Sequence, residues 1–432
     1  MLSQTGSVWD QVDTQGLDQH PEILLLVADD LLDASVAKVG RTGLTVENIF
    51  RCMLLKQLLR VSYEQLAFHL SDSMTYRSFA RLPATTMPSR SGLQSTIRSI
   101  RPETLEKVHE SLAASWLKTG ILSMEKLRID STVVASNIAP PSDSQLLNDG
   151  VRVLSRLLMK SKNITGVKIR FTDQRKPSKS LAFQIFNAKN AGKEVLYPKL
   201  LTVVRIVLKQ VDRGLEAVEV GACDSDKKKL WVSQVEQYRN LVLRVINQTE
   251  RRVIRKENVH SSEKVVSLFE PHTDIIVKGF RDVQYGHKIN LSSERSGFIT
   301  YLSIEKGNPA DSSLFMPVLD FHRSKLHRLP HSVVADGGYA SQENVTKGRG
   351  LGVKRVVFHK PVGLSLHAMG VKSKMFTQLR NFRAGVEGNI SELKRAFGAT
   401  KANWKGLDGF KAYVWSSVLS YNLVRLARLD SG

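Results

Sequence analysis

One acidic side chain, Glu387, lies among basic ones in the segment RNFRAGVEGNISELKRAFG, residues 380–398. If this segment is a helix, Arg383, Glu387 and Lys394 fall within about 40° of one another around its axis. One interpretation is an ordinary helix surface on which an acid and a base pair across one turn. The other is that the carboxylate binds a metal ion while the two cations bind a phosphate backbone. The spacing alone leaves both interpretations open.

The rest of this segment predicts an amphipathic helix with its charges on one edge. Glu392, the other acid nearby, points about 140° away from Glu387, so we do not expect the two to share a site. Gly385 and Gly388 each weaken a helix by about 1 kcal/mol relative to alanine, which predicts that another group approaches the backbone closely there. An apolar stripe lies beside the charged edge: Phe382, Val386, Ile390, Leu393 and Phe397.

Two aspartates lie on, or directly after, predicted strands. Asp130 belongs to EKLRIDSTVV (125–134), whose alternating and then continuous apolar residues predict a buried strand. Asp336 follows the short apolar run in HSVVADGGYAS (331–341), and two glycines after it allow a sharp turn. In open α/β sheets, ligands bind at the carboxyl ends of strands. Asp336 is therefore well placed for chemistry.

A β-hairpin is predicted between these two aspartates. The segment YGHKINLSSERSGFITYLSI (285–304) contains two alternating runs around Ser296-Gly297. His287, in the first run, is interpreted as a strand histidine with a structural partner, although it could face the site. Asp311, a few residues later, is interpreted as the N-cap of a short helix.

Helical patterns rich in positive charge occupy residues 142–262, between the first predicted strand and this hairpin. Within 151–190 there are ten lysines or arginines but a single acid, Asp173. Such a one-sided density favours a surface that faces phosphates, with a solvated charged face as the alternative. The block is either an insertion into the sheet domain or a separate domain. The residues expected to contact phosphates are Lys160, Lys162, Lys168 and Arg170.

Residues 1–118 are predicted to form a helical N-terminal domain. Its first strongly patterned helix carries an apolar stripe, and the next begins with Ser62 and Gln65 at the spacing of a capping box. A third helical pattern breaks at Pro102. Short helices joined by tight turns fit a helix-turn-helix-like module for binding DNA, and they fit a plain helical bundle equally well.

The composition favours a polyanionic partner. The 432 residues carry a formal net charge of +22, and 42% of them are hydrophobic, which is ample for globular cores. An anionic membrane is the rival partner, but no polybasic amphipathic anchor, lipidation motif or long apolar run supports it. The first residues lack the pattern of a signal peptide, and the two cysteines have neither zinc nor disulfide spacing, which predicts a reducing cytoplasm. The motifs of phosphate-binding loops, zinc proteases and serine hydrolases are absent.

The three acids and their surroundings resemble the DDE transposases of bacterial insertion sequences, in particular the IS4/IS5-like group with a ribonuclease-H-like catalytic core. The stretches that carry the resemblance are RIDSTVV, VVADGGYAS and RAGVEGNISELKRAFG. The group has a tyrosine–arginine–glutamate–lysine signature, and here Arg383 lies four residues before Glu387 and Lys394 seven residues after it. The position of the tyrosine holds Arg380 instead.

The resemblance implies an α/β fold, in which residues 119–432 form a mixed sheet with flanking helices around a basic helical insertion. It implies Mg²⁺ as the cofactor, with Mn²⁺ as a substitute. It implies that Arg383 and Lys394 bind the DNA end. The implied catalytic residues, which are also the implied metal ligands, are Asp130, Asp336 and Glu387.

The activity implied is cleavage of phosphodiester bonds at the ends of an insertion sequence, followed by joining of the 3′-hydroxyl to target DNA through two-metal-ion catalysis. The expected partners are double-stranded DNA, as terminal inverted repeats and as target, and further copies of the chain bound to it. The expected location is the nucleoid in a bacterial cytoplasm. Two alternatives stay open: a catalytically inactive relative that acts as a repressor, and a nuclease of similar fold that never joins strands.

Overall fold

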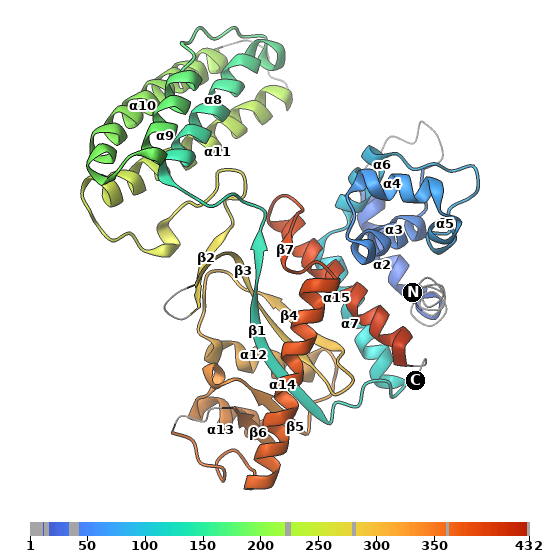
Figure 1. Cartoon of the computed structure of the whole chain (residues 1–432). Coiled ribbons are helices and arrows are strands. Elements are labelled where there is room, and N and C mark those ends of the chain that lie inside the picture. Colours follow the sequence, from blue (N-terminus) through green and yellow to red (C-terminus); the bar gives the residue numbers. More distant parts are fainter. Residues whose placement is uncertain are drawn as a thin grey trace. The chain divides into compact units, whose positions relative to one another are not determined.

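The chain divides into two compact units (Figure 1). The first combines Met1–Asn137 with Ile276–Gly432, and the second is Ile138–Ile275, so the second is inserted in the chain between two parts of the first. The domain boundary predicted between residues 118 and 119 lies within the first unit and stays a prediction. The computed structural model describes residues 12, 17–33, 43–220, 226–278, 282–359 and 363–429.

In the described part of the chain, a mixed seven-stranded sheet forms the centre of the first unit. Its strands are β1 (Lys126–Ser136), β2 (Asp274–Lys278), β3 (Asp282–Ser293), β4 (Ile299–Ile304), β5 (Ser332–Ala335), β6 (Arg355–Phe358) and β7 (Lys401–Ala402). The main path has the order β2-β3-β1-β5-β6, while β4 pairs with β3 and β7 pairs with β1. β1 runs antiparallel to β3 and parallel to β5. This mixed α/β architecture confirms the predicted ribonuclease-H-like fold class.

The strand sequences explain which way the side chains point. β1 is a regular strand, so Arg128 and Asp130 share one face of the sheet, and Ile129 and Ser131 share the other. β5 and β6 are short, almost wholly buried apolar runs, as is typical of parallel strands covered on both faces. The predicted hairpin forms from β3 and β4, and Gly297 allows its turn with a φ of +90°. β2 extends the sheet beyond the strands that the sequence predicted.

Helices on the sheet position its functional edge. The helix predicted around Glu387 is α14 (Ser373–Ala396), and it packs across β1, β5 and β6. α12 (Phe315–Ser324) contributes Phe315 and Leu319 to a hydrophobic core that also contains Ile129 of β1. α13 (Gln342–Gly350) packs against β6. The last helix, α15 (Leu407–Leu429), is buried along most of its length.

The N-terminal residues form the helices that the sequence predicts. The Ser62–Gln65 capping box is present at the start of its helix, and another helix begins at Pro102, where the pattern breaks. The helices are α2 (Glu22–Asp33), α3 (Val46–Leu59), α4 (Tyr63–Asp72), α5 (Met74–Phe79), α6 (Arg90–Ser99) and α7 (Pro102–Lys118). α3 and α7 both pack on α15, so these helices share a core with the C-terminal part of the chain. A helix-turn-helix role for them stays a prediction.

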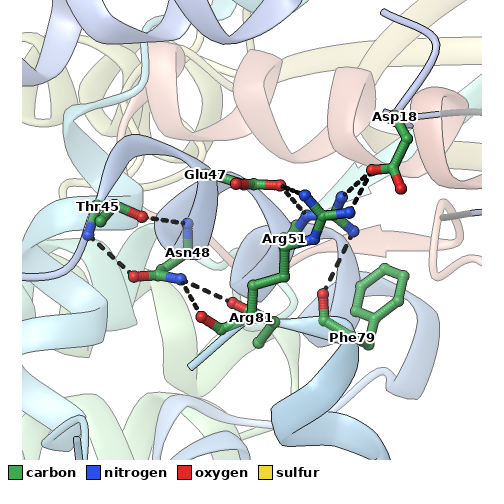
Figure 2. Close-up of polar contacts among 8 residues, drawn as sticks. Asp18, Thr45, Glu47, Asn48, Arg51, Phe79 and Arg81 are labelled. Carbon is green, nitrogen blue, oxygen red and sulfur yellow. Dashed lines mark hydrogen bonds and ion pairs between the residues drawn. The ribbon is translucent and has the colours of Figure 1, made fainter. Parts of the chain in front are cut away.

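A buried arginine links α3 to the last residue of α5 (Figure 2). Arg51 donates to Glu47 at 2.9 Å and to Asp18 at 2.8 Å. It also donates to the carbonyl oxygen of Phe79 at 3.3 Å. Arg81 donates to the same two carboxylates, at 2.7 and 2.5 Å. Burial, and to a lesser extent the charge of Arg81, lowers the pKa of Arg51 to about 10. The shared carboxylates offset the cost of burying this cation, so the network is structural.

The second unit is a group of helices that lie side by side (Figure 1). They are α8 (Asp143–Thr165), α9 (Arg175–Asn187), α10 (Asn190–Val220) and α11 (Asp226–Thr249). Their shared core includes Leu147, Val204, Trp231 and Val242. The helical patterns predicted for 142–262 are therefore present. α10 has 31 residues, yet neither it nor any other helix in the described ranges is apolar enough to cross a membrane.

Two buried histidines make the stability of the first unit depend on pH. His109 of α7 contacts the carbonyl oxygen of Ile299 at 2.8 Å, and His322 of α12 contacts that of Val318 at 2.7 Å. Burial lowers the pKa of each to about 4, compared with roughly 6.5 in an unfolded chain. Because the unfolded chain takes up protons first, the stability that depends on neutral histidines is complete above about pH 6.5 and is lost toward pH 4.

We expect the free energy of unfolding to fall by about 2 to 3 kcal/mol per histidine as the pH drops from 6.5 to 4. Urea denaturation at a series of pH values would measure it. A His322→Gln variant should be less stable at pH 7 and should show a flatter profile over the same range. A wild-type profile that is flat between pH 6.5 and 4 would contradict this prediction.

Candidate active site

Three predicted site acids converge on one guanidinium group, that of Arg383 on α14. Its Nη2 donates to Oδ2 of Asp130 on β1 at 2.9 Å. The same nitrogen lies 3.7 Å from Oδ1 of Asp336, the residue directly after β5. Its Nη1 donates to Oε1 of Glu387, one turn further along α14, at 2.7 Å. Residues from three separate elements of the first unit therefore meet at one point.

The site is closed at one end and open at the other. The exposed fraction of the side chain rises from 11% at Arg383 and 15% at Asp130 to 43% at Asp336 and 65% at Glu387. Three carboxylates so close together repel one another, and the shared guanidinium relieves that repulsion. Tyr339 is buried beside the acids. Its burial, and then the charges of Asp311, Asp130 and Asp336, raise its pKa well above the ordinary value.

The carboxylates suit a hard divalent cation in their chemistry. Mg²⁺ and Mn²⁺ prefer carboxylate oxygens and keep part of their water shell, and the exposed side of the site gives solvent access. Within the described ranges, no group of three or more His, Cys, Asp or Glu side chains lies close enough to hold a metal ion. The physical reason is that the guanidinium of Arg383 lies between the three acids. A cation that bound all three acids would have to compete with it.

Arg128 fixes α14 against β1, two residues from Asp130. Its guanidinium donates to the carbonyl oxygen of Phe382 at 3.2 Å and to Asn389 at 3.3 Å, and it lies 4.9 Å from the centre of the Phe382 ring. A Cβ atom on Gly385 would overlap Nη1 of Arg128, so the close approach predicted at that glycine is confirmed. At Gly388 the prediction was wrong, because in the part of the chain that the structure describes no atom outside the nearby backbone of α14 lies within 4 Å of where a Cβ would be.

Two family models match the chain. One is described as a transposase DDE domain and matches residues 285–423. The other is described as a transposase domain (DUF772) and matches residues 18–101. The chain belongs to the DDE transposases. The predicted resemblance to the IS4/IS5-like kind is thereby confirmed. The match to the DDE domain contains Asp336 and Glu387 and begins after Asp130. No curated protein and no solved structure matches the chain significantly.

A fourth acid of the transposase, Asp311, lies beside the site. Its predicted role was wrong. Asp311 was predicted to be an N-cap, but the N-cap of its short helix is Ala310, without a side-chain bond. Asp311 instead accepts from Ser131 at 3.0 Å and pairs with Lys288 at 2.5 Å. Ser131 follows Asp130 on β1, and the partners of Asp311 belong to strands far from it in sequence. No local pattern could have indicated this contact.

The structure also describes three other residues that were considered in the sequence, His287, Glu392 and Lys394. His287 is buried, contacts the carbonyl oxygen of Glu305 at 3.2 Å and lies against the ring of Phe410, as the structural interpretation requires. Glu392 pairs with Arg428 at 2.6 Å, away from the three acids, as predicted. Lys394 lies two turns beyond Glu387 on α14 and is half-buried.

The predicted phosphate contacts of the basic block belong to the second unit of the transposase. Lys160 and Lys162 lie in the last turns of α8, and Lys168 and Arg170 lie in the connection between α8 and α9. All four side chains are exposed. They therefore have the accessibility that a contact with DNA needs.

Proposed function

We propose that the transposase cleaves phosphodiester bonds at the ends of its own element and joins the freed 3′-hydroxyl to target DNA. The observation that supports this most is the convergence of Asp130, Asp336 and Glu387 on Arg383. The structural network of Arg51 contains two acids, whereas Arg383 gathers three acids from three elements. An inactive relative that acts as a repressor would have no use for this arrangement.

We assign the binding of divalent metal ions to the same three carboxylates. Two such ions, when bound, supply Lewis-acid activation of the attacking oxygen and stabilise the leaving oxygen. The chain's own contribution is to hold three acids close to one another at the carboxyl edge of the sheet, beside the guanidinium of Arg383. Arg383 carries five N–H donors in a fork that matches phosphate as well as carboxylate oxygens. It can therefore orient the phosphate that enters between the acids.

Further contacts to DNA are proposed for exposed or half-buried cations outside this cluster. Lys394 lies two turns beyond Glu387 on α14, and we assign it a contact with the backbone of a DNA end. The basic helical insertion would bind the phosphates of duplex DNA with its exposed cations. Transposition acts on both ends of one element, so we propose that two or more copies assemble on that DNA. The cations assigned to the insertion are Lys160, Lys162, Lys168 and Arg170.

Purified transposase, incubated with labelled DNA from both ends of its element, a target plasmid and Mg²⁺, should yield a nicked strand with a free 3′-hydroxyl and then a joined product. Chelation with EDTA should abolish both products while a retarded complex of protein and DNA remains. Denaturing gels resolve the two steps. A complex without any cut strand would favour the repressor, and cut strands that are never joined would favour a nuclease.

A further inference from the structure

A pocket of about 640 Å³ lies in the second unit, between the first half of α8 and the helix α9. A single acid, Asp173, faces it. Two phenylalanines, Phe183 and Phe186, lie at its side. The cations that line it are Arg152, Arg156, Arg175, Lys176 and Lys179. Such a lining combines aromatic rings with an excess of positive charge.

The rings and two of the cations lie on one stripe of α9. On a helix, Lys176, Lys179, Phe183 and Phe186 fall within about 80° of one another. Ile185, on the opposite side, is buried in the unit, and so is Ala182, which lies next to the stripe. Phe183 is 68% exposed and Phe186 is 80% exposed. The stripe therefore presents two aromatic rings to solvent beside two cations. Other apolar residues of α9 pack it against the unit, so its packing does not require these two rings.

The charge of the pocket is only partly neutralised by the protein. Arg175 pairs with Asp173 at 2.6 Å, and Arg152 pairs with Asp149 at 2.9 Å. Among the residues that the structure describes, the other three cations of the lining make no ion pair with an acid; these are Arg156, Lys176 and Lys179. An anionic ligand would supply the missing charge.

A ligand for this pocket must offer both phosphates and flat faces. Duplex DNA offers phosphates, but its bases are stacked on one another and present only their edges in the grooves. Single-stranded DNA offers phosphates to cations and unstacked bases to aromatic rings, and base–ring stacking accepts any sequence. A protein partner with an acidic, aromatic segment is the other class that could fit. It would not explain why the same block carries further exposed cations outside the pocket, at Lys160, Lys162, Lys168 and Arg170.

We propose that this pocket binds a single-stranded DNA segment, with bases on Phe183 and Phe186 and phosphates on Arg156, Lys176 and Lys179. Strand cleavage at an element end frees a strand end, which supplies such a segment once it unpairs, so the proposal rests on the proposed function for the origin of its ligand. The pocket itself lies wholly within the second unit. Its binding can therefore be measured without any cleavage.

The test is fluorescence anisotropy of the full chain with a labelled oligothymidylate of about 12 nucleotides, a length within the range of single-strand sites. A duplex of the same length is measured in parallel. We expect Phe183→Ala combined with Phe186→Ala to weaken single-strand binding by roughly tenfold or more, with little change in duplex binding. The matched control is Leu230→Ala, an exposed apolar residue on α11 outside the pocket, and it should change neither.

A second variant tests the charge. Lys176→Gln combined with Lys179→Gln should flatten the dependence of log K on log salt for the oligothymidylate by about 1.4, or about 0.7 for each phosphate. The proposal is overturned if the two alanine substitutions leave single-strand binding unchanged or weaken duplex binding equally. It is also overturned if a poly-glutamate peptide binds as tightly as the oligonucleotide. Failure of the wild type to cut element ends would count against the proposed function and leave these binding results intact.

Discussion

Asp130→Asn, Asp336→Asn and Glu387→Gln are each expected to lower strand cleavage by more than about 100-fold while duplex DNA is still bound with nearly wild-type affinity. Each substitution keeps the size of the side chain and removes a charged oxygen ligand. Loss of an outer-shell partner of a metal already costs about 10- to 100-fold, so loss of a direct ligand should cost more. Cleavage is measured in single turnover with saturating protein, so that a change in binding cannot imitate a change in chemistry.

Glu392→Gln is the matched control for these three substitutions. Glu392 lies on the same helix as Glu387, but its carboxylate pairs with Arg428 and approaches Arg425 instead of the site. Its loss should leave cleavage unchanged and lower the free energy of unfolding by no more than about 1 kcal/mol, as expected of an exposed ion pair. Near wild-type cleavage by any one of the three acid variants would remove that residue from the active site.

Residue patterns predicted the elements that carry the three acids, because those elements are locally encoded. Alternation in β1, the short apolar run of β5 and the amphipathic period of α14 are each visible within about ten residues. The capping box at Ser62 and the turn at Gly297 depend on a few neighbouring residues as well. Placement of Asp130, Asp336 and Glu387 near one another then followed from the family resemblance rather than from these patterns.

The contacts between distant segments could not be predicted in the same way. Asp311 has the sequence context of a helix cap, yet its partners Ser131 and Lys288 lie on two other strands. Gly385 is the exception, since its low helix propensity did indicate the close approach that Arg128 makes. Gly388 has the same low helix propensity, but among the described residues it has no such neighbour. A glycine within a helix therefore permits a close approach by another group without showing that one occurs.

From the sequence, the charged edge of α14 had two interpretations, a helix-surface ion pair and a functional site. The contacts of Arg383 are consistent with both. Its bond to Glu387 is the i,i+4 pair of an ordinary helix surface. Its contacts to Asp130 and Asp336 are not, because they cross from α14 to two strands of the sheet. Its side chain is also the least exposed of the four. Arg383 therefore stabilises the resting site as a cation, and we propose that it positions the phosphate during the reaction.

These two roles separate in the variants Arg383→Gln and Arg383→Lys. In the presence of EDTA, Arg383→Gln leaves three acids without their shared cation, so its free energy of unfolding should fall by about 1 to 3 kcal/mol. Arg383→Lys keeps the charge and should lose less. Added Mg²⁺ should stabilise the Gln variant more than the wild type, because the ion no longer competes with the guanidinium and binding to the folded state adds stability. Thermal denaturation with and without Mg²⁺ measures both effects.

Added Mg²⁺ should not restore the activity of the two Arg383 variants, even where it restores their stability. A misplaced phosphate can cost about 10²-fold in rate, and lysine lacks the planar fork that holds two phosphate oxygens at once. We therefore expect both variants to cleave and join DNA about 100-fold more slowly at saturating Mg²⁺, whereas Arg395→Gln, on the exposed side of α14, stays near the wild type. If Mg²⁺ restored activity along with stability in Arg383→Gln, the guanidinium would only hold the place of a metal ion. A residual defect in a folded, metal-bound variant is what assigns Arg383 to the phosphate.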